Sequence, residues 1–288
     1  MNKIQETELI LNPDGSVYHL HLHPENIAET IIVVGDQERV AAISNRFDAI
    51  EFKVQNREFV THTGRVGGKR ITALSTGIGT DNIDIVLNEL DAAVNIDLKE
   101  RVPKKEHTSL NIIRIGTSGS LQADVPVDGF LLSTHGLGFD GLMNFYDVEK
   151  TKESEELVDA FITHTAWKNN LARPYLFAGS SKLISKLEEG MYKGITATAP
   201  GFYAPQGREL RLNASMKNLN EKLTSFSFNG QRITNFEMET SALFGLGSAL
   251  GHQCATVCAI IGNRVTMQFS KNYKKAVDKL IDTVLERV

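Results

Sequence analysis

The stretch Asn111-Ile112-Ile113-Arg114-Ile115-Gly116-Thr117-Ser118-Gly119 contains the features that decide the fold of this chain. Its apolar, β-branched half predicts a strand buried in a parallel sheet. The strand ends in a Gly-Thr-Ser-Gly turn, whose backbone N–H groups and hydroxyls suit the oxygens of an anion such as phosphate. Arg114 stands inside the apolar run, where burying an unpaired guanidinium would be costly. We therefore expect an α/β fold with an anion site at the carboxyl end of this strand.

The same strand pattern recurs along the chain and alternates with helical patterns. Further short β-branched runs predict strands over residues 30–34, 70–75, 130–133, 194–199 and 254–261. Apolar residues at three- and four-residue spacing predict helices over residues 82–94, 237–250 and 272–288. Strands alternating with helices favour an α/β fold with a mainly parallel sheet. Because no repeat or linker divides the chain, residues 1–288 are expected to form a single domain.

Composition and charge exclude several classes of function. The chain has 31 Lys and Arg against 35 Asp and Glu, a net charge of −4 that argues against a nucleic acid polymer as partner. Eighteen apolar residues never run together, so no membrane span is expected. The polar N-terminus lacks the pattern of a signal peptide. The only cysteines, Cys254 and Cys258, are expected to be buried thiols of a cytoplasmic protein rather than a metal or redox pair.

Two further segments are interpreted as structural. The run Ser75-Thr76-Gly77-Ile78-Gly79-Thr80 lacks the third glycine of a dinucleotide fingerprint, so we interpret it as a strand-to-helix turn. The charged residues clustered in segment 98–110 predict a solvated surface loop.

Polar residues at two other strand and helix ends are candidate ligand contacts. The run 30–34 is followed by Gly35 and Asp36, and Arg39 comes four residues after the glycine. Glu237 and Glu239 open the expected helix 237–250 but are two residues apart, so they do not form a paired acid/base site. Their role stays open between favouring the helix dipole and accepting hydrogen bonds from sugar hydroxyls.

Eight motifs follow one another in a fixed order along the chain: Val17-Tyr18-His19-Leu20, Gly35-Asp36-x-x-Arg39-Val40, Arg57-Glu58-Phe59, Ser75-Thr76-Gly77-Ile78-Gly79, Arg114-Ile115-Gly116-Thr117-Ser118-Gly119, Phe202-Tyr203-x-x-Gln206-Gly207-Arg208, Glu237-Met238-Glu239 and Asn263-Arg264. Together they resemble the trimeric and hexameric nucleoside phosphorylases and, within them, the uridine phosphorylases. The resemblance implies a three-layer α/β/α sandwich around a central mixed β-sheet. It also implies phosphorolysis of uridine to uracil and α-ribose 1-phosphate, by at least a homodimer and often by a hexamer of three dimers.

The resemblance assigns roles to matched positions. It implies a phosphate site made of Gly35, Arg39, Arg114 and Thr117, with Arg57 supplied by the neighbouring subunit. It implies a ribose site made of Met238 and Glu239, with His19 also supplied by the neighbour. The implied base site consists of Phe202, Gln206, Arg208 and Arg264. Arg208, Gln206 and Arg114 are the implied catalytic residues.

The resemblance implies an enzyme that requires no cofactor and uses inorganic phosphate as its cosubstrate. In some bacterial members a monovalent cation such as K⁺ lies between subunits, and Glu58, Ile71 and Ser75 match its ligands.

Three alternatives to uridine phosphorolysis stay open. A purine nucleoside phosphorylase of the same fold commonly uses an aspartate after the penultimate strand, where this chain has Ile261-Gly262-Asn263-Arg264. A nucleosidase uses water and does not need Arg39, Arg57 and Arg114. A non-catalytic nucleoside-binding protein would have lost some of the matched ligands, and none is lost here.

Overall fold

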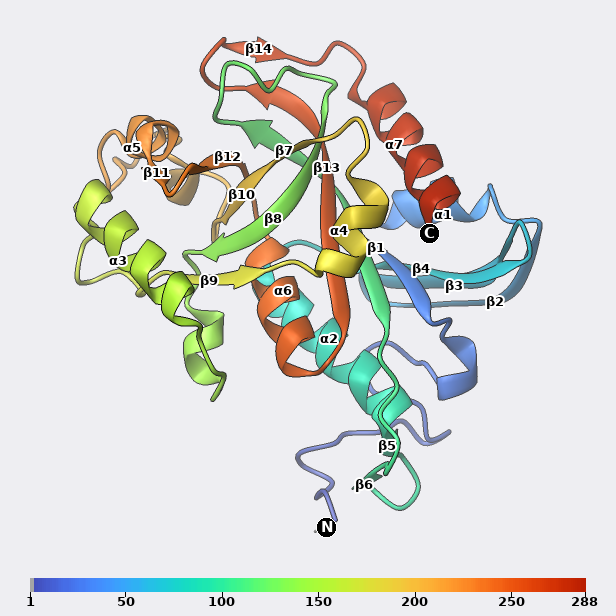
Figure 1. The fold of residues 1–288 in the computed structure, drawn as a ribbon. Helices are drawn as coiled ribbons and strands as arrows, with labels where there is room; N and C mark the ends of the chain where they lie inside the picture. Colours follow the sequence, from blue (N-terminus) through green and yellow to red (C-terminus); the bar gives the residue numbers. More distant parts are fainter. Residues whose placement is uncertain (1–2) are drawn as a thin grey trace.

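A 12-stranded sheet forms the centre of the computed structural model, which describes residues 3–288 (Figure 1). Its strands follow the order β11-β12-β10-β8-β13-β7-β1-β4-β3-β2, while β14 pairs with β13 and β9 with β8. The bounds of these strands are β1 (Thr30–Val34), β2 (Ala49–Asn56), β3 (Phe59–Val66), β4 (Lys69–Ser75), β7 (Asn111–Ser120), β8 (Phe130–Gly138), β9 (Tyr175–Ala178), β10 (Tyr192–Thr198), β11 (Ser227–Phe228), β12 (Gln231–Glu237), β13 (Gln253–Asn263) and β14 (Gln268–Phe269). All six expected strands are therefore present.

Seven α-helices surround the sheet in the described part of the chain: α1 (Gln37–Ser44), α2 (Thr80–Asn95), α3 (Lys152–Thr165), α4 (Ser181–Leu187), α5 (Leu219–Ser225), α6 (Thr240–Ala249) and α7 (Tyr273–Arg287). Three short 3₁₀ helices accompany them: η1 (Pro24–Asn26), η2 (Leu142–Phe145) and η3 (Ala204–Gln206). The helices expected over residues 82–94 and 272–288 are confirmed as α2 and α7.

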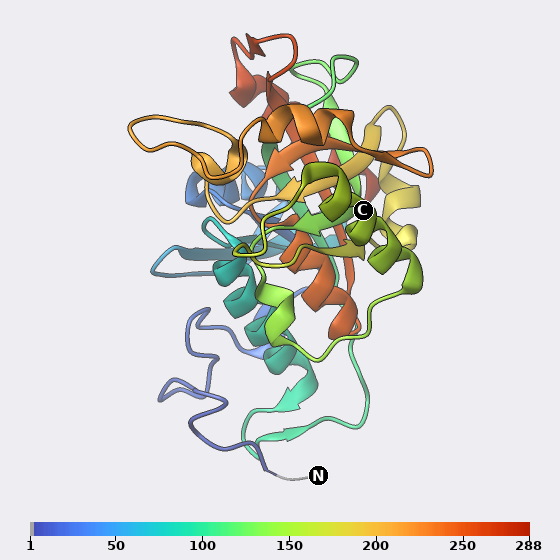
Figure 2. The same cartoon turned by 90° about the vertical axis from the view of Figure 1, so that its left-hand side faces the viewer.

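Strand β1 shows why helices cover both faces of the sheet. Ile31 and Val33 pack into one apolar cluster with α2 and α6, whereas Ile32 and Val34 pack into a second cluster with α1, α4 and α7. Because successive side chains point to opposite faces, a strand buried on both sides must be apolar throughout. Figure 1 shows the sheet face, and the turned view of Figure 2 shows α2 (teal) and α4 (yellow) on opposite sides of the strands. The expected α/β/α sandwich is confirmed.

The sheet is mixed, so the expectation of a mainly parallel sheet was only partly right. Strand β1 is parallel to β4 and β7, and β7 is parallel to β13. The hairpins β2-β3-β4 and the pair β8–β13 are antiparallel. Strand β12 also pairs antiparallel with β7, at Asn235↔Ser120 and Phe236↔Gly119, which closes a ring of strands. This closure brings the end of β12 beside the end of β7.

The helix expected over residues 237–250 was wrong at its start. Residues 231–237 form strand β12, and α6 begins only at Thr240. The Glu237 carboxylate accepts hydrogen bonds from the backbone N–H groups of Glu239 and Thr240 at 2.9 Å. Because this contact satisfies N–H groups at the helix start, Glu237 stabilises α6 from outside the helix.

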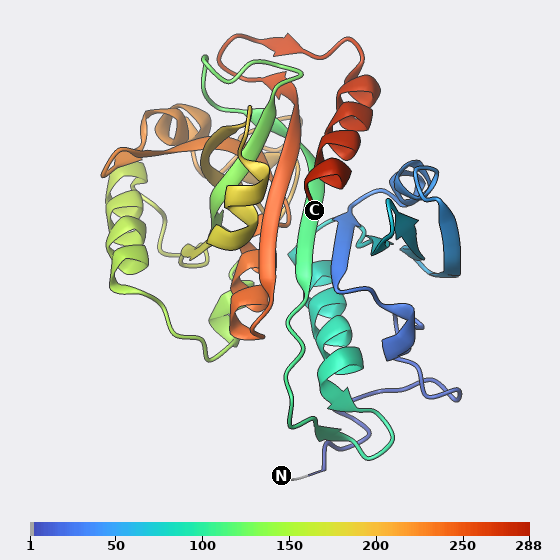
Figure 3. The ribbon, with the colours of Figure 1, turned by 45° about the vertical axis from the view of Figure 1, so that its right-hand side comes forward.

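The charged segment 98–110 is more ordered than the surface loop expected from its sequence. Strands β5 (Ile96–Asp97) and β6 (Val102–Pro103) pair as a small hairpin beyond α2. Figure 3 shows this hairpin beside the N-terminal segment, where the Ile4 N–H donates to the Arg101 carbonyl at 2.8 Å. Residues 103–109 are exposed, as expected of a solvated segment.

Two findings within residues 3–288 concern the membrane and the cysteines. No helix there is long and apolar enough to cross a membrane. Cys254 and Cys258 are buried, unpaired thiols on β13.

Burial of His135 on β8 makes the stability of the fold depend on pH. Burial lowers the pKa of this imidazole below its ordinary value near 6.5, with a smaller opposing effect of Glu153. The unfolded chain therefore binds a proton at a higher pH than the folded chain. We expect the free energy of unfolding to fall as pH drops below about 6.5. Between pH 7.5 and 5.5 the variant His135→Gln should lose less stability than the wild type, as measured by urea unfolding. An equal loss in both proteins would contradict the assignment of this pH dependence to His135.

Candidate active site

A cleft of about 1180 Å³ opens at the carboxyl ends of β1, β4, β7, β12 and β13. This is the edge where α/β sheets commonly bind ligands. Eleven of the residues that the sequence singled out line this one cleft: Gly35, Arg39, Glu58, Arg114, Thr117, Phe202, Gln206, Arg208, Met238, Glu239 and Arg264.

One end of the cleft is shaped for an anion. Asp36 caps α1 by accepting a hydrogen bond from the Glu38 N–H at 2.9 Å, so the α1 N-terminus opens beside Gly35. Arg39, in the first turn of α1, donates to the Ile115 carbonyl of β7 at 3.2 Å. Burial lowers the pKa of Arg39, and Asp36 partly offsets this. A guanidinium and a helix N-terminus at one place favour bound phosphate.

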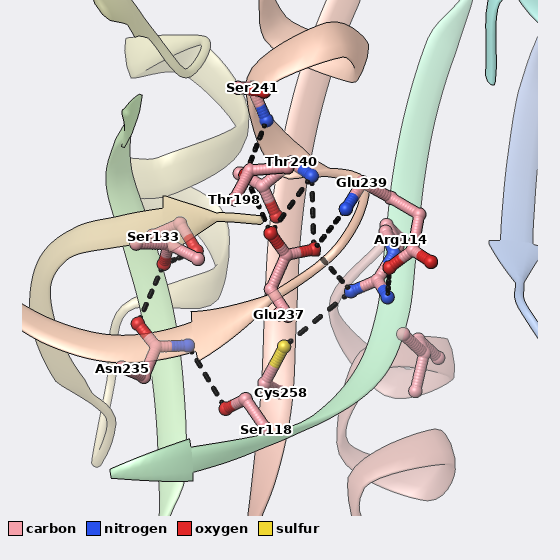
Figure 4. A network of polar contacts seen from close by, with 12 residues as sticks. Arg114, Ser118, Ser133, Thr198, Asn235, Glu237, Glu239, Thr240, Ser241 and Cys258 are labelled. Atoms are coloured by element: carbon pink, nitrogen blue, oxygen red, sulfur yellow. Dashed lines mark hydrogen bonds and ion pairs between the residues drawn. The ribbon is translucent and has the colours of Figure 1, made fainter. Parts of the chain in front are cut away.

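Arg114 lines the cleft and is buried between two carboxylates (Figure 4). Its Nη1 lies 3.2 Å from Glu237 Oε2, and its Nη2 donates to Glu239 Oε2. Burial alone would lower the pKa of Arg114, but Glu239 and Glu237 outweigh it and raise the pKa above its ordinary value. The alternation of β7 explains this position, because Ile113 and Ile115 pack on one face and Arg114 points to the other.

The two glutamates have different roles, which the sequence left open. Glu237 is satisfied by protein groups, since it also accepts from Thr198 Oγ1 at 2.7 Å. Glu239 lines the cleft, and its Oε1 accepts from the Gly79 N–H at 2.9 Å. Gly79 adopts a φ of +103°, which a residue with a side chain rarely does. The 75–80 turn therefore joins β4 to α2, as expected, and also holds Glu239.

Gly116 leaves room for the Arg114 side chain, and this leads to a prediction. A Cβ at position 116 would lie 2.1 Å from Arg114 Nη1 and 3.0 Å from Cys258 Sγ. Gly116→Ala should therefore displace the guanidinium, lowering stability by about 1–3 kcal/mol and weakening anion binding. Urea unfolding and phosphate titration measure the two effects. The control Gly119→Ala, whose Cβ would meet nothing nearer than 3.7 Å, should leave stability unchanged; equal losses in both variants would contradict the explanation.

The other end of the cleft gathers two arginines around one amide. Gln206 Oε1 accepts from Arg208 Nη1 at 2.8 Å and lies 3.4 Å from Arg264 Nη2. Arg264 Nη1 also donates to the Gln206 carbonyl and to Asn220 Oδ1. The Arg208 guanidinium lies 3.7 Å from the centre of the Phe202 ring, a cation–π contact.

This end of the cleft is electropositive. The protein groups that accept from Arg208 and Arg264 are amides and backbone carbonyls, not carboxylates, within residues 3–288. Burial and then the charge of Arg208 lower the pKa of Arg264 to about 10. Burial also lowers the pKa of Arg208. Two cations with neutral partners favour a ligand group that carries or develops negative charge.

Comparisons with known proteins agree with this architecture. The model of the Phosphorylase superfamily matches residues 29–287 of the chain. The chain belongs to the phosphorylase superfamily. It is similar to a uridine phosphorylase of Thermococcus kodakarensis, 28% identical over 276 residues that cover 96% of this chain and 87% of the relative. A uridine phosphorylase of Haemophilus influenzae is 27% identical, over 94% of this chain and 96% of the relative.

A solved structure extends the likeness to three dimensions. A Trypanosoma brucei nucleoside phosphorylase described as showing uridine phosphorylase activity superposes with a TM-score of 0.89 and 29% identity, covering 97% of this chain and 98% of that one. The protein is thus a nucleoside phosphorylase family enzyme.

Two expected site residues of this phosphorylase lie outside its own cleft. Arg57 is exposed at the turn between β2 and β3, with its guanidinium 6.0 Å from the centre of the Tyr18 ring. His19 is half-buried against Glu89 of α2. These are the two residues that the resemblance assigned to a neighbouring subunit.

The expected cation ligands lie on strand β4 and in the turn before β3. Ser75 Oγ donates to the Glu58 carbonyl at 2.6 Å and accepts from the Val60 N–H at 2.7 Å, so its hydroxyl is already satisfied. Ile71 is buried and pairs with Gly64, several residues along both strands from Glu58. Glu58, Ile71 and Ser75 therefore stay a predicted K⁺ site, because a cation between subunits would also take ligands from a second copy of the chain.

Three other side chains lie close enough together to suggest a metal site. Ligand atoms of Asp91, His107 and His252 lie within 4.8 Å of one another, the only such group in residues 3–288. His252 Nδ1 accepts the Leu110 N–H at 3.2 Å, so a neutral ring carries its proton on Nε2, the nitrogen facing Asp91. That nitrogen has no lone pair for a metal, and the group is better explained as a contact that ties segment 98–110 to the fold.

Several cleft residues were not predicted from the sequence. Ile78 and Asn82 line the cleft from the β4–α2 turn, and Met267 and Phe269 line it from the β13–β14 hairpin. Met267 and Phe269 are 86% and 68% exposed. The signal for Met267 and Phe269 is a pair of exposed apolar side chains beside a polar cleft. This arrangement appears only in the folded chain, so the sequence could not reveal it.

Proposed function

We propose that this phosphorylase cleaves uridine with inorganic phosphate, giving uracil and α-ribose 1-phosphate. The names of the similar proteins from Thermococcus kodakarensis and Haemophilus influenzae support this substrate. The carboxylate-free arrangement of Gln206, Arg208 and Arg264 is the observation that carries the proposal. Uracil offers two carbonyl oxygens, which are suited to donors of this kind.

The proposed reaction is a displacement at C1′ of the ribose. Phosphate, held by Arg39, Arg114, Thr117 and the α1 N-terminus near Gly35, attacks C1′ from the face opposite the base. As the C1′–O bond forms, the C1′–N1 bond breaks and its electron pair passes to the uracil ring. Arg208 and Gln206 stabilise the negative charge that develops on the base, and protonation by solvent completes the product. Attack from the opposite face inverts C1′ and yields the α-sugar phosphate.

The proposal also covers the residues that bind the ribose and those that a neighbouring subunit would supply. Met238 and Glu239 line the same cleft and would hold the sugar, and Glu239 retains acceptor capacity for sugar hydroxyls. Arg57 and His19 do not line their own cleft, so we propose a homodimer in which each subunit supplies them to its neighbour. Phe202 would pack against the base or sugar.

Purine phosphorolysis is the nearest alternative, and the end of β13 argues against it. Asn263 donates to the Gln122 and Val125 carbonyls at 2.8 and 2.9 Å, and it accepts from the Val265 and Thr266 N–H groups. An asparagine cannot act as a general acid, and here all its polar atoms bind backbone.

Product analysis tests the proposed reaction. Uridine and phosphate should yield α-ribose 1-phosphate, identified by ³¹P and ¹H NMR. Free ribose would instead indicate hydrolysis, and binding of uridine without any product would indicate a non-catalytic nucleoside-binding protein. Either result would contradict the roles proposed for Arg39, Arg57 and Arg114.

A further inference from the structure

Glu89 of α2 holds His19 through three contacts. Its carboxylate accepts hydrogen bonds from the backbone N–H groups of His19 at 2.9 Å and Leu20 at 2.8 Å. Its Oε1 lies 2.6 Å from His19 Nδ1. The two side chains are only 26% and 15% exposed. One carboxylate thus fixes both the backbone and the ring of His19.

This contact decides which ring nitrogen of His19 is available to a ligand. An ionised carboxylate can only accept, so the proton between the two groups belongs to His19 Nδ1. In the neutral ring Nε2 then carries a lone pair and can accept a hydrogen bond from a hydroxyl. No protein group among residues 3–288 hydrogen-bonds to Nε2.

The surroundings of His19 join it to the hairpin that carries Arg57. Asn56 Nδ2 donates to the His19 carbonyl at 2.7 Å, and the Phe59 ring meets the imidazole edge-on at 6.3 Å. Asn56 and Phe59 flank the β2–β3 turn at which Arg57 is exposed. Glu89 therefore anchors a unit that contains both residues proposed to reach the neighbouring cleft.

We infer that Glu89 is a positioning residue for catalysis: it orients His19 and sets its tautomer, so that Nε2 accepts a hydrogen bond from a hydroxyl of the nucleoside sugar in the neighbouring subunit. This inference rests on the proposed function. A carboxylate that only tethered the N-terminal segment would be satisfied by the two backbone N–H groups. The third contact, to Nδ1, gives Glu89 a chemical role.

The test compares Glu89→Gln, His19→Ala and the double variant on uridine and on its 2′-, 3′- and 5′-deoxy analogues. His19→Ala should lower kcat/KM for uridine about tenfold, and have no effect on the one analogue that lacks its hydroxyl partner. Glu89→Gln should reproduce this selective loss, and the double variant should be no worse than His19→Ala. Glu156→Gln, an exposed glutamate of α3, is the matched control.

Two outcomes would overturn the role of Glu89. One is an equal loss on uridine and all three analogues; the other is a loss that adds fully to that of His19→Ala. Either would make Glu89 a structural tether only.

A second measurement does not depend on activity. ¹H–¹⁵N correlation spectra of ¹⁵N-histidine-labelled protein, with His19 assigned by its absence in His19→Ala, should show a ring protonated at Nδ1. A ring protonated only at Nε2 would overturn the inference even if uridine is cleaved. If the wild-type protein cleaves no uridine, the proposed function fails, and this spectrum alone decides whether Glu89 sets the tautomer.

Discussion

Replacing Arg208 by methionine should lower kcat for uridine phosphorolysis about 10²- to 10³-fold, the usual effect of removing one donor to a developing oxyanion. Arg208 is half-buried, its acceptors are the Phe202 carbonyl and Gln206 Oε1, and no carboxylate pairs with it in the described structure. Its charge is therefore available to the departing uracil. Methionine keeps much of the side-chain length and its packing on Phe202 while removing the charge.

Steady-state kinetics with saturating phosphate measure this effect. The matched control is Arg211→Met, an exposed arginine three residues further along that does not line the cleft. The control should keep wild-type kcat within about threefold. A similar kcat in Arg208→Met and the wild type, with only KM raised, would mean that Arg208 binds substrate and leaving group equally well.

Replacing Arg114 by methionine should destabilise the fold by about 3–5 kcal/mol, the cost of breaking a buried ion pair by removing one partner. The variant leaves Glu237 and Glu239 buried, with side chains only 1% and 4% exposed. Burial already raises the pKa of Glu237, and Arg114 opposes this rise. Without Arg114 the pKa of Glu237 should rise further, so this carboxylate should become protonated, and lose its buried charge, at a higher pH. The difference in unfolding free energy between wild type and variant should therefore be smaller at acidic pH.

Urea unfolding measures this effect and separates it from a surface contribution. Adding Glu237→Gln to Arg114→Met should recover part of the lost stability, because one buried charge is removed. Arg232→Met is the control, since its pair with Asp124 is 41% and 61% exposed and should contribute at most about 1 kcal/mol. Equal losses in Arg114→Met and Arg232→Met would refute the buried network as a source of stability.

The strands and helices that were predicted share one property, a continuous apolar run or a complete helical period. Strand β12 was missed because Gln231, Arg232, Thr234, Asn235 and Glu237 make it look polar. Thr234, Asn235 and Glu237 are nevertheless buried. Their polar groups are paired across the ring of strands, for example Asn235 Nδ2 with Ser118 Oγ at 2.9 Å. A propensity argument cannot anticipate partners more than a hundred residues away.

The candidate site could be predicted where a residue breaks a local rule. Arg114 in an apolar strand and Gly35 after a strand end were identified from sequence, and both line the cleft. Glu237 and Glu239 both contact Arg114, and their separate roles depend on their other partners. Thr198 bonds to Glu237 and Gly79 to Glu239, which the sequence does not reveal. The cation ligands expected at Glu58, Ile71 and Ser75 stay a prediction, because they concern a site between two copies of the chain.

Release of the free base from uridine, measured with and without phosphate and with inosine as a parallel substrate, tests the central claim most directly. We expect uracil release that requires phosphate, with kcat/KM for uridine at least about a hundredfold above that for inosine, the discrimination that unpaired polar groups in a base site can supply. Release of hypoxanthine from inosine at a similar rate would contradict the assignment of Gln206, Arg208 and Arg264 to a pyrimidine. Release of uracil without phosphate would contradict phosphorolysis itself.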